Sequence, residues 1–350
     1  MGWREIIRSE YKGYKVDVPD LPIKLSRNEN PFDLPQELKE EVFKDLSEIS
    51  WNRYPDGKSS KLRERLSSFL NIPSENIMVG LGSGDLIQII ANGILKPKDK
   101  VILPVPTFSL YEKIFEQKEA EILKIYLNKD NFSININELK NSWNFNPKLL
   151  VITNPNNPTG NLLLKEDDVL KLKDFPGLIL IDEAYYEFSD VTFLPYIKEI
   201  PNLMILRTFS KAFSAAGVRI GYLIANPNVI EFLGNYKLPY NLNIFSQVVG
   251  IKVLDFWNML KKKIDIIKEE KEKTYNRMKE LRNLEVYPSH TNFLLFRSAK
   301  KEIILKKCEE NGISLRDFSR EPLLENCLRV SIGSSDENER FLKTIREVLL

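Results

Sequence analysis

The sequence contains a single histidine, His290, among 350 residues. A Ser-His-Asp triad would have to use this one residue, and a zinc site built from two or three histidines is excluded. The only cysteines, Cys308 and Cys327, form no CxxC pair, and two cysteines in a chain of this size indicate reduced thiols rather than a disulfide. Metal catalysis would depend on carboxylates alone, so we expect no metal site.

Excess charge and long apolar runs are also missing. The net charge is +2, with 51 Lys and Arg against 49 Asp and Glu mixed along the chain. This balance gives no electrostatic basis for binding nucleic acid or an anionic membrane surface. No apolar stretch approaches the roughly 20 residues of a membrane-spanning helix, and the N-terminus carries charge where a signal peptide needs an apolar run. We therefore expect a cytoplasmic protein.

The order of apolar segments predicts an α/β fold. Several continuous apolar runs bounded by polar residues, proline or glycine are typical of strands buried on both faces of a mostly parallel sheet. These runs lie at residues 101–103, 149–152, 178–181 and 203–206. Helical segments fall between them, so the sheet is expected to be flanked by helices. Pro104 and Pro106 are expected to close the first of these strands.

The pattern changes after about residue 245, where a long Lys- and Glu-rich helix is expected over residues 258–281. Shorter strands and helices follow it and indicate a smaller α+β domain. We expect residues 1–45 to form an N-terminal arm and part of the small domain. Residues 46–250 are expected to form the large domain, and residues 251–350 the small one.

Polar residues follow several predicted strands. In open α/β sheets a ligand binds beyond the carboxyl ends of the strands, so these residues are candidates for one site. Lys211 follows the strand at 203–206 and lies between Ser210 and Ala212. Judged by position alone, it is better interpreted as a lysine whose stem lies on apolar surface while its amine reaches water.

The residues around Lys211 overturn that interpretation. Ser210-Lys211, Phe213, Gly217, Arg219 and Gly221 spell S-K-x-F-x-x-x-G-x-R-x-G. Upstream, the chain reads NPNNPTG at 154–160 and DEAY at 182–185. The three motifs, in this order, resemble the pyridoxal-5′-phosphate (PLP) dependent aminotransferases of the aspartate-aminotransferase fold type. Each motif alone is a moderate signal, whereas the three together are specific.

The resemblance implies PLP as cofactor, with Lys211 forming the Schiff base and, once displaced, transferring protons. Asp182 would keep the ring nitrogen protonated, which the carbanion chemistry of PLP requires. As an acidic residue at a strand end, Asp182 has helix capping as its alternative role. Asn157 and Tyr185 resemble the donors to the phenolate oxygen of the ring.

A glycine-rich turn opens the helix expected after residue 85, and free N–H groups at a helix N-terminus bind anions. Such turns are common, so this signal is weak alone. The resemblance implies these ligands for the cofactor phosphate: Gly82, Ser83, Gly84, Thr208, Ser210 and Arg219. Phe108 falls where the family stacks an aromatic ring on PLP, more usually tyrosine, and core packing is its alternative role.

The resemblance narrows to the histidinol-phosphate aminotransferases and covers nearly the whole chain. The segments that carry it are residues 28–32, 54–56, 182–188, 207–213, 239–241, 291–293 and 327–333. It implies that Arg316 and Arg329 receive the anionic end of the substrate, because a guanidinium binds phosphate or carboxylate bidentately. Tyr14 loosely matches a substrate-binding tyrosine of the N-terminal arm. Tyr54 resembles a residue that reaches the cofactor phosphate of a second subunit, which implies a homodimer.

The implied reaction converts histidinol phosphate and 2-oxoglutarate to imidazole acetol phosphate and glutamate by a ping-pong mechanism. Two related enzymes remain as alternatives, a threonine-phosphate decarboxylase and an aromatic-amino-acid transaminase of broad specificity. A non-enzymatic PLP-binding regulatory module is a third, although the match begins within the first 30 residues and leaves no room for a preceding DNA-binding domain. A fourth is an α/β protein without a cofactor.

Overall fold

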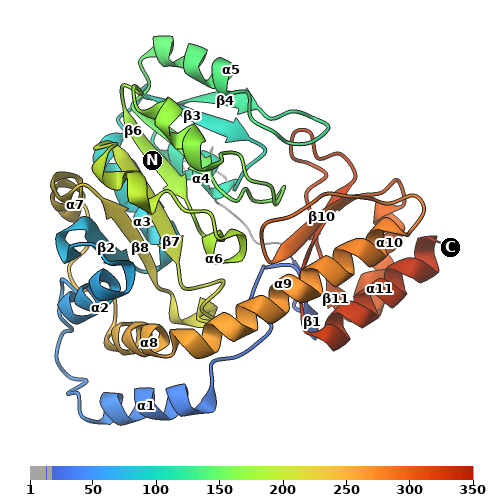
Figure 1. Ribbon diagram of the computed structural model, residues 1–350, viewed down its shortest axis with the longest axis horizontal. Helices are drawn as coiled ribbons and strands as arrows, with labels where there is room; N and C mark the ends of the chain where they lie inside the picture. The colour runs from blue at the N-terminus through green and yellow to red at the C-terminus, as the bar shows by residue number, and fades with distance from the viewer. Residues whose placement is uncertain (1–12, 14–17, 350) are drawn as a thin grey trace, which may run out of the picture.

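The central feature of the computed structural model, which describes residue 13 and residues 18–349, is a seven-stranded sheet (Figure 1). Its order is β2-β8-β7-β6-β5-β3-β4. The strands are β2 (Ile77–Gly80), β3 (Lys100–Val105), β4 (Glu121–Tyr126), β5 (Leu149–Thr153), β6 (Leu178–Asp182), β7 (Leu203–Thr208) and β8 (Gly221–Ala225). Within this sheet β8 alone runs opposite to the common direction of the other strands, so the predicted mostly parallel sheet is confirmed.

Both faces of this sheet are buried, as the continuous apolar runs predicted. In β6, Ile179 and Ile181 belong to one hydrophobic cluster while Leu180 between them belongs to the other, and all three are fully buried. The helices around the sheet are α2 (Ser60–Leu70), α3 (Gly82–Ile94), α4 (Leu110–Gln117), α5 (Ile136–Asn141), α6 (Tyr186–Ser189), α7 (Pro227–Gly234) and α8 (Ile244–Asp255). Helix α1 (Gln36–Ser47) packs on α8.

A second, four-stranded antiparallel sheet lies in the C-terminal part of the chain, in the order β12-β13-β10-β9. Its strands are β9 (Glu285–Val286), β10 (Phe293–Arg297), β12 (Arg316–Asp317) and β13 (Cys327–Ser331), and α10 (Lys301–Glu310) and α11 (Ser335–Leu349) accompany it. Strand β1 (Ile23–Lys24) pairs with β11 (Ile313–Ser314), which joins the N-terminal segment to this part. The proposed domain boundaries at residues 45 and 250 stay predictions.

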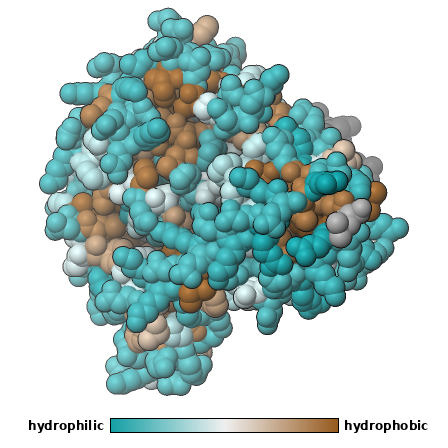
Figure 2. All heavy atoms as spheres, turned by 45° about the vertical axis from the view of Figure 1, so that its right-hand side comes forward, coloured by the Kyte–Doolittle hydropathy of each residue, from teal (hydrophilic) through white to brown (hydrophobic). Residues whose placement is uncertain are grey.

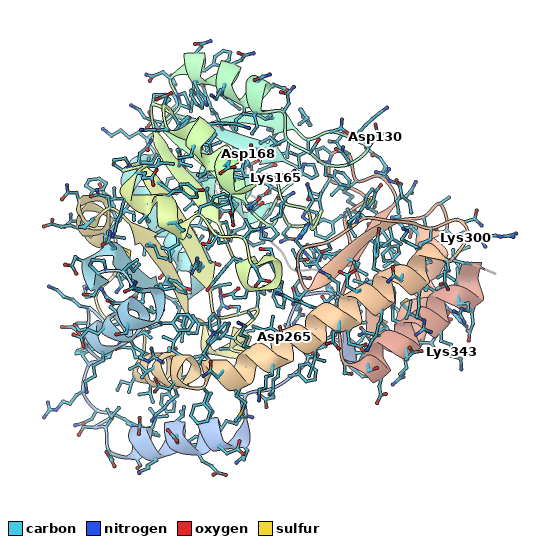
Figure 3. The ribbon with its side chains drawn as sticks, viewed as in Figure 1. Asp130, Lys165, Asp168, Asp265, Lys300 and Lys343 are labelled. Carbon is cyan, nitrogen blue, oxygen red and sulfur yellow. The ribbon has the colours of Figure 1, made fainter. Side chains whose placement is uncertain are left out.

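Helix α9 (Trp257–Lys279) runs along both parts of the molecule (Figure 1). Its apolar stripe of Leu260, Ile264 and Ile267 is buried, while polar residues cover its outer side. Asp265 of α9 and Lys343 of α11 are both exposed (Figure 3). Polar residues likewise cover most of the face shown in Figure 2, between smaller apolar patches.

The end of strand β3 differs from the expectation. The expectation that the strand closes at Pro104 was wrong, because β3 continues through Pro104 to Val105 and ends directly before Pro106. Pro104 lies beyond Ile102, the last β3 residue in register with β5, so its missing N–H is tolerated there.

Cys308 and Cys327 are buried free thiols, as expected. No helix among the described residues is long and apolar enough to cross a membrane.

Short 3-10 helices occupy several connections: Ser74–Asn76, Ser142–Phe145, Glu166–Leu172, Leu194–Lys198 and Ala216–Val218.

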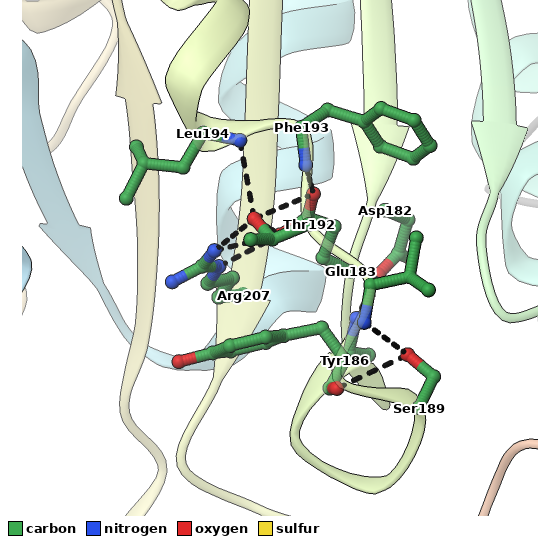
Figure 4. A network of polar contacts seen from close by, with 10 residues as sticks. Asp182, Glu183, Tyr186, Ser189, Thr192, Phe193, Leu194 and Arg207 are labelled. Carbon is green, nitrogen blue, oxygen red and sulfur yellow. Dashed lines mark hydrogen bonds and ion pairs between the residues drawn. The ribbon is translucent and has the colours of Figure 1, made fainter. Parts of the chain in front are cut away.

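A buried ion pair fixes β6 against β7 (Figure 4). Nε and Nη2 of Arg207 both donate to Oε2 of Glu183, at 2.9 and 2.8 Å, and both side chains are almost fully buried. Thr192 bridges the pair, since its hydroxyl accepts from Arg207 and donates to Glu183. The ring of Tyr186 stacks on the guanidinium, 3.6 Å from ring centroid to Cζ. Because Glu183 follows Asp182 and Arg207 precedes Thr208, this pair sets the relative position of two candidate site residues.

We expect Arg207→Met to lower the free energy of unfolding by about 3–5 kcal/mol, because it leaves the Glu183 carboxylate buried without its cation. Denaturant unfolding measures the change. The matched control is Lys171→Met, which removes the exposed ion pair with Asp168 and should cost less than about 1 kcal/mol. Equal losses in both variants would contradict the structural importance of the buried pair.

Candidate active site

A pocket of about 370 Å³ opens beyond the carboxyl ends of the parallel strands. Thr153 of β5, Asp182 of β6 and Thr208 of β7 lie at its floor, where the three strands end. This is the edge at which open α/β sheets bind ligands. The C-terminal sheet contributes residues from the other side, so most of the predicted site residues meet in one cavity.

Lys211 is half-buried and its amine lies in this pocket, where Nζ donates to the carbonyl oxygen of Arg27 at 2.8 Å. Burial lowers the pKa of Lys211 to about 7, and the positive charges of Arg329 and Arg219 act in the same direction. The Glu29 carboxylate opposes them and raises the pKa. A substantial fraction of this amine is therefore neutral, and nucleophilic, at neutral pH.

Asp182 is buried at the floor of the pocket, and its carboxylate is held by two donors. The Tyr111 hydroxyl donates to Oδ2 at 2.8 Å, and the Ala184 N–H donates to Oδ1 at 3.0 Å. Burial raises the pKa of Asp182 to about 6, while both hydrogen bonds lower it. The carboxylate form therefore predominates at pH 7, as a partner for a protonated ring nitrogen requires.

Tyr111 is a site residue to which the sequence analysis gave no role. It is fully buried, and a buried tyrosine usually needs a partner for its hydroxyl. Its closeness to Phe108 in the sequence was the available signal, and the Tyr111 N–H donates to the Phe108 carbonyl oxygen at 3.1 Å. Phe108 is half-buried in the pocket wall, with its ring edge-on to Tyr111 at a centroid distance of 6.1 Å.

An anion cradle lies at the N-terminus of α3, which begins at Gly82. Gly82 has φ +79°, and a β-carbon there would lie 2.5 Å from Nη2 of Arg219. A β-carbon on Gly221 would lie 2.5 Å from the Ser83 amide nitrogen. Only glycine at both positions allows the helix N-terminus, the arginine and the adjacent strand to approach this closely.

Hydroxyl groups complete the cradle. The Thr208 hydroxyl lies 3.0 Å from the Ser210 hydroxyl, and Nη1 of Arg219 donates to the same Ser210 oxygen at 3.2 Å. Ser83, Gly84, Thr208, Ser210 and Arg219 all line the pocket. Helix N–H groups, hydroxyls and a guanidinium form the donor set that a phosphate monoester needs, so these residues fit the phosphate of the expected cofactor.

The two arginines of the C-terminal sheet lie side by side at the pocket. Arg316 of β12 is in register with Arg329 of β13, and residues directly opposite each other share one face of a sheet. Like charges in this arrangement repel each other, and an anion between them relieves the repulsion. Arg329 is buried, and it donates to the Ser26 carbonyl at 2.8 Å and to the Asn157 side-chain oxygen at 2.5 Å. The contact with Asn157 joins this sheet to the large one.

Tyr185 is buried and lines the same pocket, and its hydroxyl accepts a hydrogen bond from Nδ2 of Asn28 at 2.8 Å. Tyr54, by contrast, lies outside the pocket of its own chain and is 81% exposed. Tyr14 lies outside the described residues. Among the described residues there is no cluster of three or more His, Cys, Asp or Glu side chains that would hold a metal ion.

The lowered pKa of Lys211 has a measurable consequence in the apoprotein. Competitive labelling with trace acetic anhydride, followed by peptide mapping, should show Lys211 acetylation rising with pH to half its plateau near pH 7, because only the neutral amine reacts. In the unfolded chain the same lysine is hydrated, and its profile should shift to about the ordinary lysine pKa of 10.4. Coincident folded and unfolded profiles would contradict the burial of this amine.

Comparisons with known proteins agree with this geometry. The family model for aminotransferases of class I and II matches residues 21–345. A histidinol-phosphate aminotransferase of Caldanaerobacter subterraneus subsp. tengcongensis is 36% identical over 348 residues, which cover 98% of this chain and 99% of the relative. That of Pyrococcus furiosus is 38% identical over 349 residues, which cover 100% of this chain and 98% of the relative.

Solved structures share the fold. The histidinol-phosphate aminotransferase from Sinorhizobium meliloti, in complex with pyridoxal-5′-phosphate, matches with a TM-score of 0.86 at 20% identity, over 94% of this chain and 91% of that chain. At this identity the likeness shows the fold alone, whereas the curated relatives are similar in sequence along their full length. The chain therefore belongs to the class I and II aminotransferases and, among them, to the histidinol-phosphate aminotransferase family.

Proposed function

We propose that this chain is a PLP-dependent enzyme that transfers the amino group of histidinol phosphate to 2-oxoglutarate, a step of histidine biosynthesis. One observation carries the proposal. The Lys211 amine, whose pKa is lowered, and the buried Asp182 carboxylate share a pocket with two separate groups of anion-binding residues. One group, around Arg219, suits the cofactor phosphate. The other, Arg316 and Arg329, suits the anionic end of the substrate.

When bound, PLP supplies an electrophilic aldehyde and a ring that accepts the electron pair left at the substrate α-carbon. We assign the proton transfers at that carbon to Lys211 Nζ, whose lowered pKa suits a general base at neutral pH. With PLP bound, Asp182 would stabilise the protonated ring nitrogen, and Asn157 and Tyr185 would bind the phenolate oxygen. Phe108 would help to hold the ring.

Arg316 and Arg329 explain how one site serves two substrates in turn. A guanidinium binds the phosphate of histidinol phosphate or a carboxylate of 2-oxoglutarate with the same planar fork. A ping-pong transaminase needs this property, because the keto product leaves before the second substrate enters. The non-enzymatic alternatives are not supported, since the relatives reported above are aminotransferases.

We also propose a cytoplasmic homodimer whose only other partners are small molecules. Exposed aromatic residues support the dimer. Tyr54 stacks on Tyr240 with ring centroids 4.6 Å apart, and Trp51 meets Phe245 edge-on at 5.0 Å. Leu238 in the same region is 75% exposed. Apolar surface of this kind marks an interaction site.

This aromatic surface adjoins the anion cradle. Asn241 donates to Oδ2 of Asp85 at 2.8 Å, and the same carboxylate oxygen accepts from the N–H of Leu81, just before α3. A second subunit bound here would bring its own Tyr54 toward the phosphate site. The free buried cysteines and the balanced charge support the cytoplasmic assignment.

The substrate is tested by a half-reaction. Pure yellow enzyme mixed with histidinol phosphate alone should convert its bound cofactor to the pyridoxamine form, with loss of the visible absorbance. Arg329→Gln should lower kcat/KM for histidinol phosphate by about 10- to 150-fold, because a charge-assisted hydrogen bond is lost. Arg346→Gln, which changes an exposed arginine of α11, is the matched control.

Other outcomes identify the rivals. Release of carbon dioxide without any amino acceptor would identify a threonine-phosphate decarboxylase. Equal use of phenylalanine and histidinol phosphate as amino donors would identify a broad-specificity aromatic transaminase. An unchanged kcat/KM in Arg329→Gln would remove Arg329 from the substrate site.

The shared site is tested by mixing two inactive chains. Lys211→Ala keeps Tyr54, and Tyr54→Ala keeps Lys211. If Tyr54 acts in the opposite subunit, a hybrid dimer contains one complete site, so an equal mixture refolded or expressed together should regain about a quarter of wild-type activity. Each variant alone gives the baseline. Hybrid dimers that stay at this baseline would contradict the shared site.

A further inference from the structure

The segment of residues 25–30 connects the two sheets at the pocket. The carbonyl oxygen of Leu25 accepts from the N–H of Ser331 at 2.8 Å, and that of Ser26 accepts from Arg329. The next carbonyl, that of Arg27, accepts from Lys211. The segment therefore binds strand β13 on one side and the lysine on the other, and Asn28 lies at its centre.

Asn28 has all four of its polar groups paired. Its N–H donates to the Ser331 hydroxyl at 2.8 Å, and that hydroxyl donates to Oδ1 of Asn28 at 3.1 Å. Its carbonyl oxygen accepts from Asn292 at 3.1 Å, and its Nδ2 donates to the Tyr185 hydroxyl at 2.8 Å. The residue is 1% exposed, so each of these bonds is shielded from water.

These bonds fix which way the amide points. The buried Ser331 hydroxyl has Oδ1 of Asn28 as the acceptor for its proton. With Nδ2 in that place, the Ser331 proton would lose this acceptor. Oδ1 on the Ser331 side leaves Nδ2 on the Tyr185 side. Tyr185 therefore accepts a hydrogen bond from Asn28 and does not donate its own proton to Asn28. With the amide reversed, Oδ1 would take the Tyr185 proton.

The backbone of Asn28 limits the residue types that fit. Its φ is +55°, in the left-handed region that glycine, asparagine and aspartate tolerate better than other residues. Glycine satisfies the backbone but lacks the amide, and aspartate has the shape but offers only acceptors. Asparagine alone among these three satisfies both the backbone conformation and the donor to Tyr185.

We propose that Asn28 is a positioning residue that directs the Tyr185 proton toward the cofactor. Through the same side chain, Asn28 connects Tyr185 to β13, the strand that carries Arg329. The link runs through Ser331, which lies two residues after Arg329 and so on the same face of β13. The inference rests on the proposed function, because it requires Tyr185 to donate to the phenolate oxygen of PLP.

The test uses the holoenzyme and the apparent pKa of its visible chromophore, measured by absorbance titration. A donor to the phenolate stabilises the deprotonated chromophore and lowers this pKa. Asn28→Gly, which keeps the backbone conformation, should therefore raise it by about 1–2, the value of a hydrogen bond to a charged group. Tyr185→Phe should raise it similarly, and the double variant should show no further rise.

Two more variants separate orientation from folding. Asn28→Asp keeps the shape and should raise the chromophore pKa at least as much as Asn28→Gly. Ser331→Ala removes the proton that orients the amide and should give a smaller rise, so it serves if Asn28→Gly does not fold. The charged groups that line the pocket around Tyr185 stay in place in every variant: Arg27, Asp182, Lys211, Arg219, Arg316 and Arg329.

If the chromophore pKa of Asn28→Gly and of Ser331→Ala equals that of the wild type, whatever their stability, Asn28 has only a structural role and the proposal is overturned. Additive shifts in the double variant would do the same. Wild-type protein without a PLP chromophore would instead refute the proposed function, so the two failures are distinguishable.

Discussion

The chemistry of this protein depends on the burial of one amine. Lys211 lies where desolvation and two guanidinium groups disfavour its charged form, and its pKa falls to about 7. A hydrated lysine would be protonated almost completely at this pH and would neither attack an aldehyde nor accept a proton. The floor of the pocket, the glycine cradle and the two arginines acquire their roles from their position around this amine.

The rest of the fold holds the partners of Lys211 in place. The parallel strands end together, so Asp182 and Thr208 lie at one edge, and the Glu183–Arg207 pair fixes the two strands on the opposite face. The C-terminal sheet meets this edge through the contact of Arg329 with Asn157. The N-terminal segment that binds β13 meets it through the contact of Asn28 with Tyr185. Substrate binding and cofactor binding therefore share one hydrogen-bonded unit rather than two independent surfaces.

Short motifs made much of the site predictable from sequence. Lys211, Asp182 and Arg219 occur in patterns whose residue types follow from the chemistry, and the buried strands follow from continuous apolar runs. The antiparallel β8 and the edge strand β4 were not predicted, because β8 follows its neighbour with no distinct turn signal and β4 mixes charged with apolar residues. Pro104 misled the strand boundary, since the register with β5 decides whether a proline is tolerated.

The features of the site that could not be predicted from the sequence are contacts between distant segments of the chain. Tyr111 meets Asp182 across 71 positions, and Asn28 meets Tyr185 across 157. The register that places Arg316 beside Arg329 is likewise a property of strand pairing and not of either segment alone. Local patterns identify which side chains carry charge or a hydroxyl, but the folded chain determines which of them touch.

The most direct measurement is reduction of the holoenzyme with borohydride, followed by proteolysis and peptide mapping. We expect one pyridoxyl-phosphate group per chain, attached to the peptide that contains Lys211. The modification should disappear in Lys211→Arg, which keeps a positive charge at this position. Reduced cofactor on another lysine of the wild-type chain, or on none, would show that Lys211 does not hold the cofactor.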